Sequence, residues 1–168
     1  AENWTVSDSE ELSLDVTSTT LKELSQIILE ISQGSIDMEN SPISYLKDWD
    51  GSCNAESHQA SIYYTYLSWI LFYAMADELG FKDWQAFITS SLMKRSYALF
   101  LQNEQSSWWD DISTDQIENR DHIIIKAHER GIKTLKSNFD SIDPTEWHWK
   151  HIHQLTHNHP LGSVKIFE

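Results

Sequence analysis

The sequence predicts a mainly α-helical protein: an irregular bundle of about four principal helices with short ones between them, followed by a C-terminal strand-and-turn segment. Two observations predict it. Apolar residues recur at helical spacing behind capping signals in several segments. Residues 62–76 are apolar at nearly every position, so a helix there must be enclosed by other helices. The 168 residues suffice for a single domain, divided into a helical region, 1–143, and a strand-and-turn region, 144–168.

The N-terminal segment predicts a short helix and then a longer amphipathic one. Ser7 to Glu10 has the spacing of a capping box, so the short helix is expected from about Asp8 to Leu14. Thr20 to Glu23 repeats the signature and begins the amphipathic helix, which ends at Gly34. Its apolar face consists of Leu21, Leu24, Ile27, Ile28 and Ile31.

Ser41 and Pro42 suit a cap and a first helical turn, which predicts a short helix over residues 43–49. The apolar run that follows predicts a buried central helix, capped by Asn54 or Ser57 and ending before Gly80. It falls short of the ~20 apolar residues that cross a bilayer, so no membrane span is expected.

Asp77 and Glu78 follow the central helix at its C-terminal end, where negative charge is unfavourable. Two explanations remain open for them: simple solvation, or a specific contact elsewhere in the fold.

A third long helix is expected after Asp83, and its inner face consists of Trp84, Phe87, Ile88, Ser91, Leu92, Leu99 and Phe100. Residues 102–111 predict a polar loop anchored by its tryptophans. A capping box over 113–116 predicts a fourth long helix with Ile117, Ile124, His128, Ile132, Leu135 and Phe139 inward. Gly131 would let another helix approach closely, and Asp143 with Pro144 ends the helix.

Residues 147–157 are rich in aromatic and β-compatible side chains and predict an extended strand, followed by a turn over 159–162. The C-terminal segment contains five of the eight histidines. On a strand, alternate residues face one side, so His151 with His153, and His157 with His159, are candidate metal ligands. Because Trp and Lys intervene and Cys53 is remote, hydrogen-bonded histidines are favoured over a metal site.

The composition excludes several classes of function. Twelve basic against 26 acidic residues give a net charge of −14, which argues against nucleic acid or anionic membrane as a partner. The single cysteine, Cys53, excludes an internal disulfide and lacks an identified base partner. No nucleophile elbow or phosphate-binding glycine loop is present, and His128 is interpreted as a core histidine. No catalytic residue and no cofactor are therefore predicted within this chain.

Four segments carry motifs of one family. They are Trp4-Thr-Val-Ser-Asp8 with Asp15-Val-Thr-Ser18; Leu46-Lys-Asp-Trp49-Asp50-Gly51; Trp108-Trp109-Asp110-Asp111; and Trp147-x-Trp149-Lys150-x-Ile152-His153 with His159-Pro160-Leu161-Gly162. In this order, over nearly the whole chain, they resemble the penicillin acylase (penicillin amidase) family of N-terminal-nucleophile hydrolases. Lys150 stands where that family usually has glycine.

The resemblance implies the helical knob of the large (beta) chain of such an amidase, with a final strand leading back to the catalytic core. Members are secreted or periplasmic precursors whose nucleophile is the N-terminal serine created by self-cleavage. Here the first residue is Ala1, so we expect a processed or excised piece without the nucleophile, inactive by itself.

By the same resemblance, the oxyanion-hole groups and the calcium possible in the full-length parent lie outside this chain. The implied partners are the catalytic core, the small chain and a small-molecule amide substrate whose acyl group the sequence does not reveal. The motif positions are expected to be structural: Asp15, Ser18, Trp49, Asp50, Gly51, Trp108, Asp110, Trp147, Trp149, His153, His159, Pro160, Leu161 and Gly162.

Two other classes remain open. The tryptophan-rich segments could be the partner surface of a stand-alone helical interaction module. The C-terminal histidines could ligate a metal ion.

Overall fold

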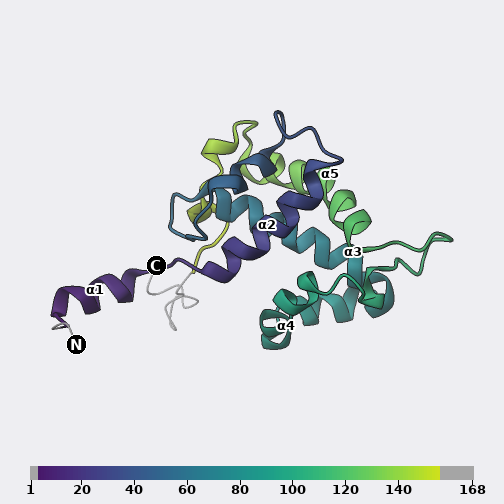
Figure 1. Ribbon diagram of the computed structural model, residues 1–168, viewed down its shortest axis with the longest axis horizontal. Helices are drawn as coiled ribbons and strands as arrows, with labels where there is room; N and C mark the ends of the chain where they lie inside the picture. Colours follow the sequence, from purple (N-terminus) through teal and green to yellow (C-terminus); the bar gives the residue numbers. More distant parts are fainter. Residues whose placement is uncertain (1–3, 156–168) are drawn as a thin grey trace, which may run out of the picture.

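The computed structural model describes residues 4–155, and within that range the named secondary-structure elements are all helices, joined by loops (Figure 1). The α-helices are α1 (Val6–Leu14), α2 (Thr19–Gln33), α3 (His58–Ile88), α4 (Ser91–Gln102) and α5 (Arg120–Phe139). Short 3-10 helices lie between and after them: η1 (Pro42–Asp48), η2 (Ser107–Trp109), η3 (Pro144–Glu146) and η4 (Trp149–His151). The mainly α fold class is confirmed.

Helix α3 is the centre of the molecule, as the apolar run predicted. Many of its side chains are completely excluded from solvent, among them Ile62, Tyr63, Tyr66, Ile70 and Ala74. Helix α5 packs along it most extensively, and η1, η2 and α4 also contact it, while α2 packs on η1, α4 and α5 (Figure 1). Burying an aliphatic or aromatic side chain contributes ~1.5–3 kcal/mol, so this helix supplies much of the folding free energy.

The starts of α1, α2, η1 and α3 agree with the predictions to within a few residues, and the caps explain the differences. Thr5 rather than Ser7 caps α1, in a reciprocal capping box with Asp8. Ser18 caps α2 two residues earlier than predicted. Ser41 caps η1 with Pro42 in its first turn, and Ser57 rather than Asn54 caps α3.

Gly80 interrupts α3, as its position predicted, but the chain resumes helical geometry at once. Its φ of 71° and ψ of 153° are not helical, yet the helix continues to Ile88. Ser90 then caps a new helix by accepting a hydrogen bond from the Met93 amide. The single third helix expected after Asp83 is therefore wrong: the cap starts α4 in a new orientation, and Leu92 and Leu99, predicted inward, are 64% and 71% exposed.

Helix α5 begins later than the capping box at 113–116 predicted. The Ser113 hydroxyl donates to Asp111 instead of capping, and Asn119 caps α5 by accepting from the His122 amide. Ile117 consequently lies in the preceding loop, 86% exposed, and its predicted inward position is wrong. The close approach at Gly131 is confirmed, because an added Cβ would lie 3.1 Å from the ring of Tyr66.

The predicted strand is wrong over its described part, residues 147–155, which form η4 and irregular backbone. The amides of Trp149 and Lys150 donate to the carbonyls of Ser57 and Ala55, so they are used without a partner strand. His157 and the turn predicted at His159–Gly162 lie outside the described residues. Along residues 4–155, no helix combines the length and apolarity needed to cross a membrane.

Candidate functional site

Two of the motif segments, far apart in the sequence, lie against each other in an antiparallel contact. The Ser18 amide donates to the Gly51 carbonyl at 3.1 Å, and the Cys53 amide donates to the Val16 carbonyl at 3.0 Å. Thr17 and Ser52 form an isolated β-bridge between these bonds. We call this contact, residues 15–18 with 49–53, the junction.

In the first segment of the junction, residues 15–18, polar side chains shape the backbone. The Asp15 carboxylate accepts from the Thr17 amide at 2.8 Å, and this bond lowers the pKa of Asp15 below its usual value. The Ser18 hydroxyl accepts from the Leu21 amide and caps α2. Both residues therefore set the direction in which α2 leaves the junction.

In the second segment, residues 49–53, each member of the tryptophan-aspartate-glycine motif has a structural role. Trp49 is 2% exposed and donates its indole N–H to the Ser52 carbonyl. Asp50 accepts from the Ser52 amide at 2.8 Å, which closes the turn. Gly51 has a φ of 88°, and a Cβ there would overlap the carbonyl oxygen of Ser18. Only glycine combines this conformation with this close approach.

The C-terminal motif segment packs beside the junction. The Trp149 and Lys150 amides donate to the carbonyls of Ser57 and Ala55 at 3.2 and 2.9 Å. The Lys150 ammonium is 2.7 Å from the Glu56 carboxylate, a contact that glycine could not make. Since Lys150 lies in a 3-10 helix, its backbone conformation does not require glycine. Trp147 is fully buried and donates to the Ser141 carbonyl.

Three stacked rings form one wall of a groove beside the junction. The Trp149 ring lies 4.9 Å from the Tyr64 ring and 4.7 Å from the His153 imidazole, with interplanar angles of 21° and 9°. The groove has a volume of about 510 Å³ and is lined mainly by apolar and aromatic residues, including Leu67, Leu71, Ile88, Met93 and Tyr97. Cys53 also lines it, and burial raises the pKa of the thiol, so it stays protonated at neutral pH.

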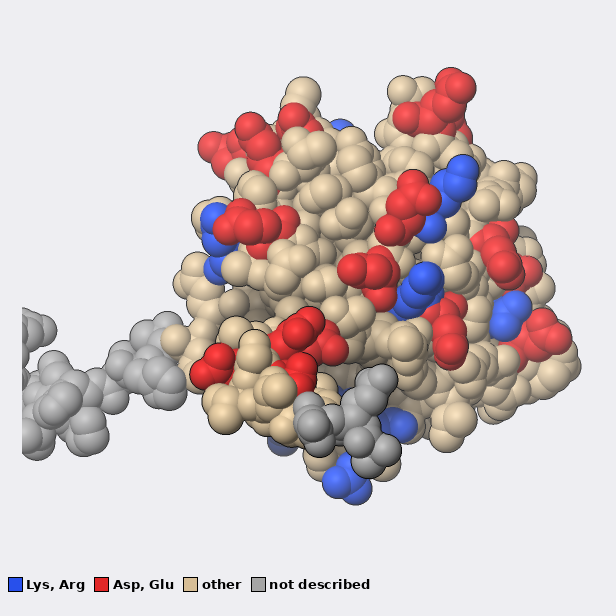
Figure 2. All heavy atoms as spheres, turned by 60° about the vertical axis from the view of Figure 1, so that its left-hand side comes forward, with Lys and Arg blue, Asp and Glu red and all other residues tan. Residues whose placement is uncertain are grey.

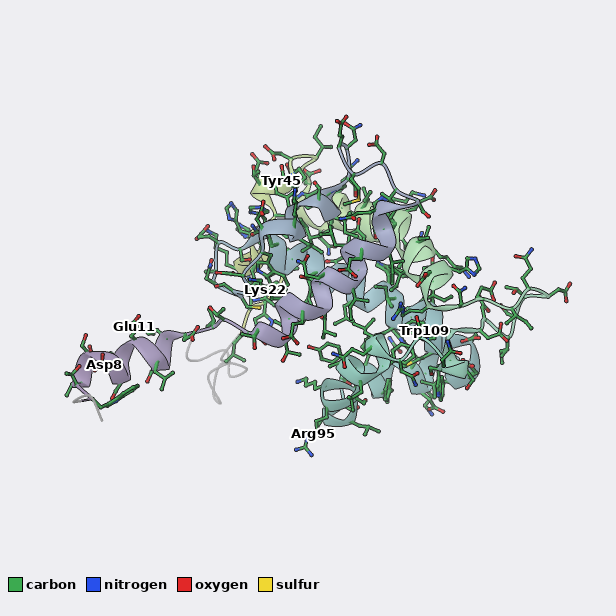
Figure 3. The ribbon with its side chains drawn as sticks, viewed as in Figure 1. Asp8, Glu11, Lys22, Tyr45, Arg95 and Trp109 are labelled. Carbon is green, nitrogen blue, oxygen red and sulfur yellow. The ribbon has the colours of Figure 1, made fainter. Side chains whose placement is uncertain are left out.

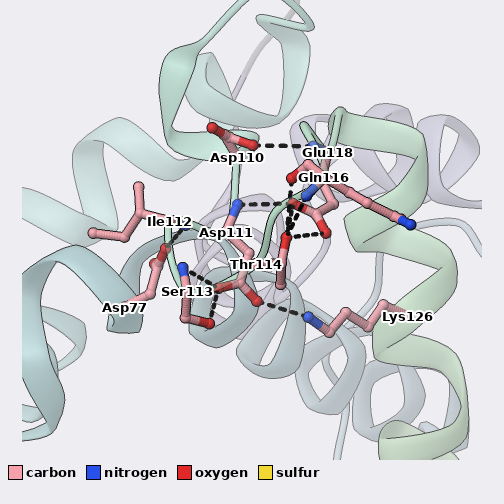
Figure 4. A network of polar contacts seen from close by, with 9 residues as sticks. All are labelled: Asp77, Asp110, Asp111, Ile112, Ser113, Thr114, Gln116, Glu118 and Lys126. Carbon is pink, nitrogen blue, oxygen red and sulfur yellow. Dashed lines mark hydrogen bonds and ion pairs between the residues drawn. The ribbon is translucent and has the colours of Figure 1, made fainter.

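The tryptophan-acidic segment forms a separate site at the other end of α3. Trp109 is 1% exposed, stacks on Phe100 at 3.9 Å and donates to the Asn103 carbonyl. Figure 4 shows the polar network that follows. Asp110 accepts from the Glu118 amide, and Asp111 accepts from Ser113 and from the Lys126 ammonium at 2.8 Å. These bonds hold the loop against α5.

Asp77 makes the specific contact that was one of its two possible explanations. Its carboxylate accepts from the Ile112 amide at 2.7 Å and joins α3, just before its kink at Gly80, to the loop (Figure 4). Partial burial, together with the neighbouring Asp77 carboxylate, raises the pKa of Glu78 to about 7. The carboxylates here therefore stabilise a loop rather than form an acid–base pair on a substrate cavity.

The family is decided by a sequence comparison. A family model described as penicillin amidase matches residues 1–168. The chain belongs to the penicillin amidase family. The junction, the stacked rings and the acidic loop are thus the structural counterparts of segments that resemble this family's motifs.

The curated relatives are named acyl-homoserine lactone acylase QuiP. The Pseudomonas putida protein is 29% identical over 140 residues, which are 78% of this chain and 17% of the relative. The Pseudomonas syringae pv. syringae protein is 26% identical over 138 residues, 79% of this chain and 17% of the relative. The chain thus spans about a sixth of the length of these relatives. No solved structure shows significant similarity to it.

In this member of the penicillin amidase family, the histidines that were candidate metal ligands have separate neighbours. The His151 ring forms a T-shaped pair with Phe139, whereas His153 stacks on Trp149. The prediction that they share a side assumed a strand, which is absent there. Within residues 4–155, no group of three or more His, Cys, Asp or Glu side chains is arranged to hold a metal ion. His157 and His159 lie outside the described residues.

His128 contacts the core, as predicted for a core histidine. Its Nδ1 lies 2.9 Å from the Tyr66 hydroxyl, and burial lowers the pKa of the imidazole.

Sequence reasoning missed two structural residues of the acidic loop. Trp108 and Asp110 were singled out, but Trp109 and Asp111 are the buried members of the two pairs, and Trp108 is 38% exposed. Adjacent identical residues carry no signal that distinguishes them. The helical turn η2, which points one indole inward, decides between them. Tyr64, the third ring of the stack, was not singled out from the sequence because it lies within the apolar run of residues 62–76.

Proposed function

We propose that this chain is the helical structural domain of an amidohydrolase whose nucleophile lies outside residues 1–168. The observation that carries the proposal is the junction. Motif segments around Ser18, Gly51 and Trp149 meet at one place and are used there for turns, caps and packing. The penicillin amidase match and the acylase names of the relatives support the reaction class.

In the proposed reaction, the parent enzyme adds water across an amide bond. The water oxygen bonds to the acyl carbon, the C–N bond breaks, and the nitrogen takes a proton, which yields a carboxylic acid and an amine. By family resemblance, an N-terminal serine attacks with its own α-amino group as base. The proposed substrate is an N-acyl-homoserine lactone, since the relatives are named for that class.

The rest of the parent chain supplies the catalytic core, the small chain and any calcium site. We place the parent in the periplasm or outside the cell, on family resemblance.

The test compares the protein encoded by the complete reading frame with the 168-residue chain. Both are incubated with N-acyl-homoserine lactones of several acyl lengths, and the free fatty acid and homoserine lactone are measured by mass spectrometry. We expect hydrolysis by the complete protein and none by the chain. Hydrolysis by the purified chain, or none by the complete protein on any amide substrate tried, would contradict the proposal.

A stand-alone helical interaction module is the second candidate, favoured by the exposed apolar residues of α1 and by Trp108. The length of the reading frame separates the two, because a module requires a stop codon near Glu168. A histidine-ligated metal protein is the third, and stoichiometric zinc or copper in chelator-free preparations would support it.

A further inference from the structure

Helix α1 contributes nothing to the core of this domain. None of its residues is buried, and the apolar side chains on and beside it are among the most exposed in the described chain. Their exposed fractions are 66% for Trp4, 77% for Val6, 63% for Leu12, 79% for Leu14 and 48% for Val16. Figure 1 shows the helix extending away from the rest of the molecule.

Within the described residues, α1 lacks the tertiary contacts that keep a short helix folded. It has 9 residues. Isolated helices shorter than about 15 residues are marginal in water. Its stabilising contacts are local: the capping box of Thr5 and Asp8, and the Trp4 indole donating to the Ser9 hydroxyl. The apolar side chains thus gain their burial energy only against a surface outside the described residues.

The apolar residues do not share one face. At ~100° per residue, Leu12 and Leu14 point to nearly opposite sides of the helix. Trp4, Leu12 and Leu14 nevertheless line one hollow of about 690 Å³ together with Asp8, Glu11 and Asp15, so Leu12 and Leu14 flank the same acidic face from its two sides. A flat partner surface would not reach both leucines, so we expect a concave socket that contacts Leu12 and Leu14 from the side of this hollow.

The charges around α1 further restrict the kind of surface to which it can bind. Asp8, Glu10, Glu11 and Asp15 lie within residues 4–16, which contain no lysine or arginine. Figure 3 shows Asp8 and Glu11 on the projecting helix, and Figure 2 shows acidic groups scattered over one face of the molecule with fewer Lys and Arg groups among them. A second copy of this chain, with its charge of −14, would repel the helix. A basic, apolar socket would attract it.

We propose that α1 docks into a socket of apolar residues bordered by Lys or Arg on the remainder of the parent chain. This inference rests on the proposed function. The curated relatives are long enough to contain such a socket, because the aligned region is only 17% of their length. Helix α1 is then the element by which the helical domain is anchored to the catalytic body.

The test is hydrogen exchange of residues 5–15, followed by mass spectrometry, in the 168-residue chain and in the complete protein. We expect rapid exchange in the chain and slowing by about tenfold or more in the complete protein. In the complete protein, Leu12→Asn and Leu14→Asn together should abolish the slowing. The matched control Ser13→Asn changes a neighbouring exposed polar residue and should preserve it.

The inference and the proposed function fail differently. Fast exchange of α1 in a complete protein that hydrolyses amides overturns the inference alone. Slow exchange in a complete protein without amidase activity supports the docking and overturns the proposed function. Protection of α1 in the isolated chain, with a dimer mass by light scattering, identifies a second copy as the partner and overturns the inference. A reading frame that encodes little beyond these 168 residues overturns both.

Discussion

At the scale of single residues, Gly51 shows why the tryptophan-aspartate-glycine motif ends in glycine. The residue has a left-handed φ of 88°, and its missing side chain leaves room for the Ser18 carbonyl. Its own carbonyl accepts the Ser18 amide, so the approach is part of the junction's hydrogen bonding. The conformation and the lack of space act together against any other residue.

Gly51→Ala is therefore expected to lower the free energy of unfolding by about 2–4 kcal/mol, from backbone strain and overlap with Ser18. The matched control is Gly34→Ala, where an added Cβ meets nothing within 4 Å and φ is −81°. That control should change stability by less than about 1 kcal/mol. Urea unfolding measures both, and equal effects would refute the role assigned to Gly51.

The second prediction at the residue scale concerns Glu78 and the pH dependence of the free energy of unfolding. Its pKa in the folded state is about 7, raised from 4.5 by partial burial and by Asp77. Between these values the folded state binds more protons than the unfolded state, so stability must fall as the pH rises from about 4.5 to 7. Much of the side chain is exposed. Solvent screening therefore limits the effect to about 1 kcal/mol.

Glu78→Gln should remove this part of the pH dependence and stabilise the protein at pH 8 relative to the wild type. Chemical unfolding at pH 5, 6.5 and 8 measures the difference. Glu10→Gln, on the solvent-exposed helix α1, is the control and should leave the curve unchanged. A parallel shift of the Glu78→Gln curve at every pH would exclude the assigned titration.

At the scale of elements, the C-terminal segment is held by aromatic packing and two backbone hydrogen bonds. Trp149 lies between Tyr64 of α3 and His153, and its amide donates to Ser57 at the cap of α3. The Lys150 and Glu56 ion pair is exposed and contributes little. The tryptophan ring is thus the main attachment of η4 to the central helix.

Trp149→Ala should destabilise the protein by about 2 kcal/mol, less than the loss of a fully buried tryptophan. The reason for the smaller loss is that the Trp149 ring is only half-buried. Trp108→Ala is the matched control, since that residue is 38% exposed. The control should cost less than about 1 kcal/mol. Thermal unfolding compares them, and a larger loss for Trp108 would show that the attachment is elsewhere.

At the scale of the whole molecule, the described chain consists of a packed body and one projecting helix. The body is built around α3, and its buried side chains come from α2, η1, α4, η2, α5 and the residues after α5. Helix α1 is joined to this body through Asp15–Ser18 only. The stability of the body should therefore depend little on α1.

Deletion of the segment 1–14 removes no buried residue of α1. The deletion is therefore expected to change the free energy of unfolding by less than about 0.5 kcal/mol. The shortened chain retains Asp15 and the junction. Urea unfolding and circular dichroism measure the outcome. A loss well above this limit, of the size that follows removal of core side chains, would mean that α1 packs against the body in solution.

Much of the architecture was predictable because the responsible signals are local. The caps at Ser41 and Ser57, the break at Gly80 and the buried run of α3 depend on neighbouring residues alone. The motifs of the candidate site could be identified from the sequence, but their position in the fold could not. That the Gly51 and Ser18 segments touch depends on the path of the whole chain between them.

The sequence by itself determined the helical class, the central helix and the family. Periodicity, capping and motif order depend only on the order of residues along the chain. Tertiary structure alone decided three other points. It converted the aromatic segment near Trp149 from a strand into η4, because the available partners were a tyrosine ring and single carbonyls. It selected Trp109 over Trp108 for burial. Within residues 4–155 it left the apolar residues of α1 unburied, because this helix projects away from the packed body.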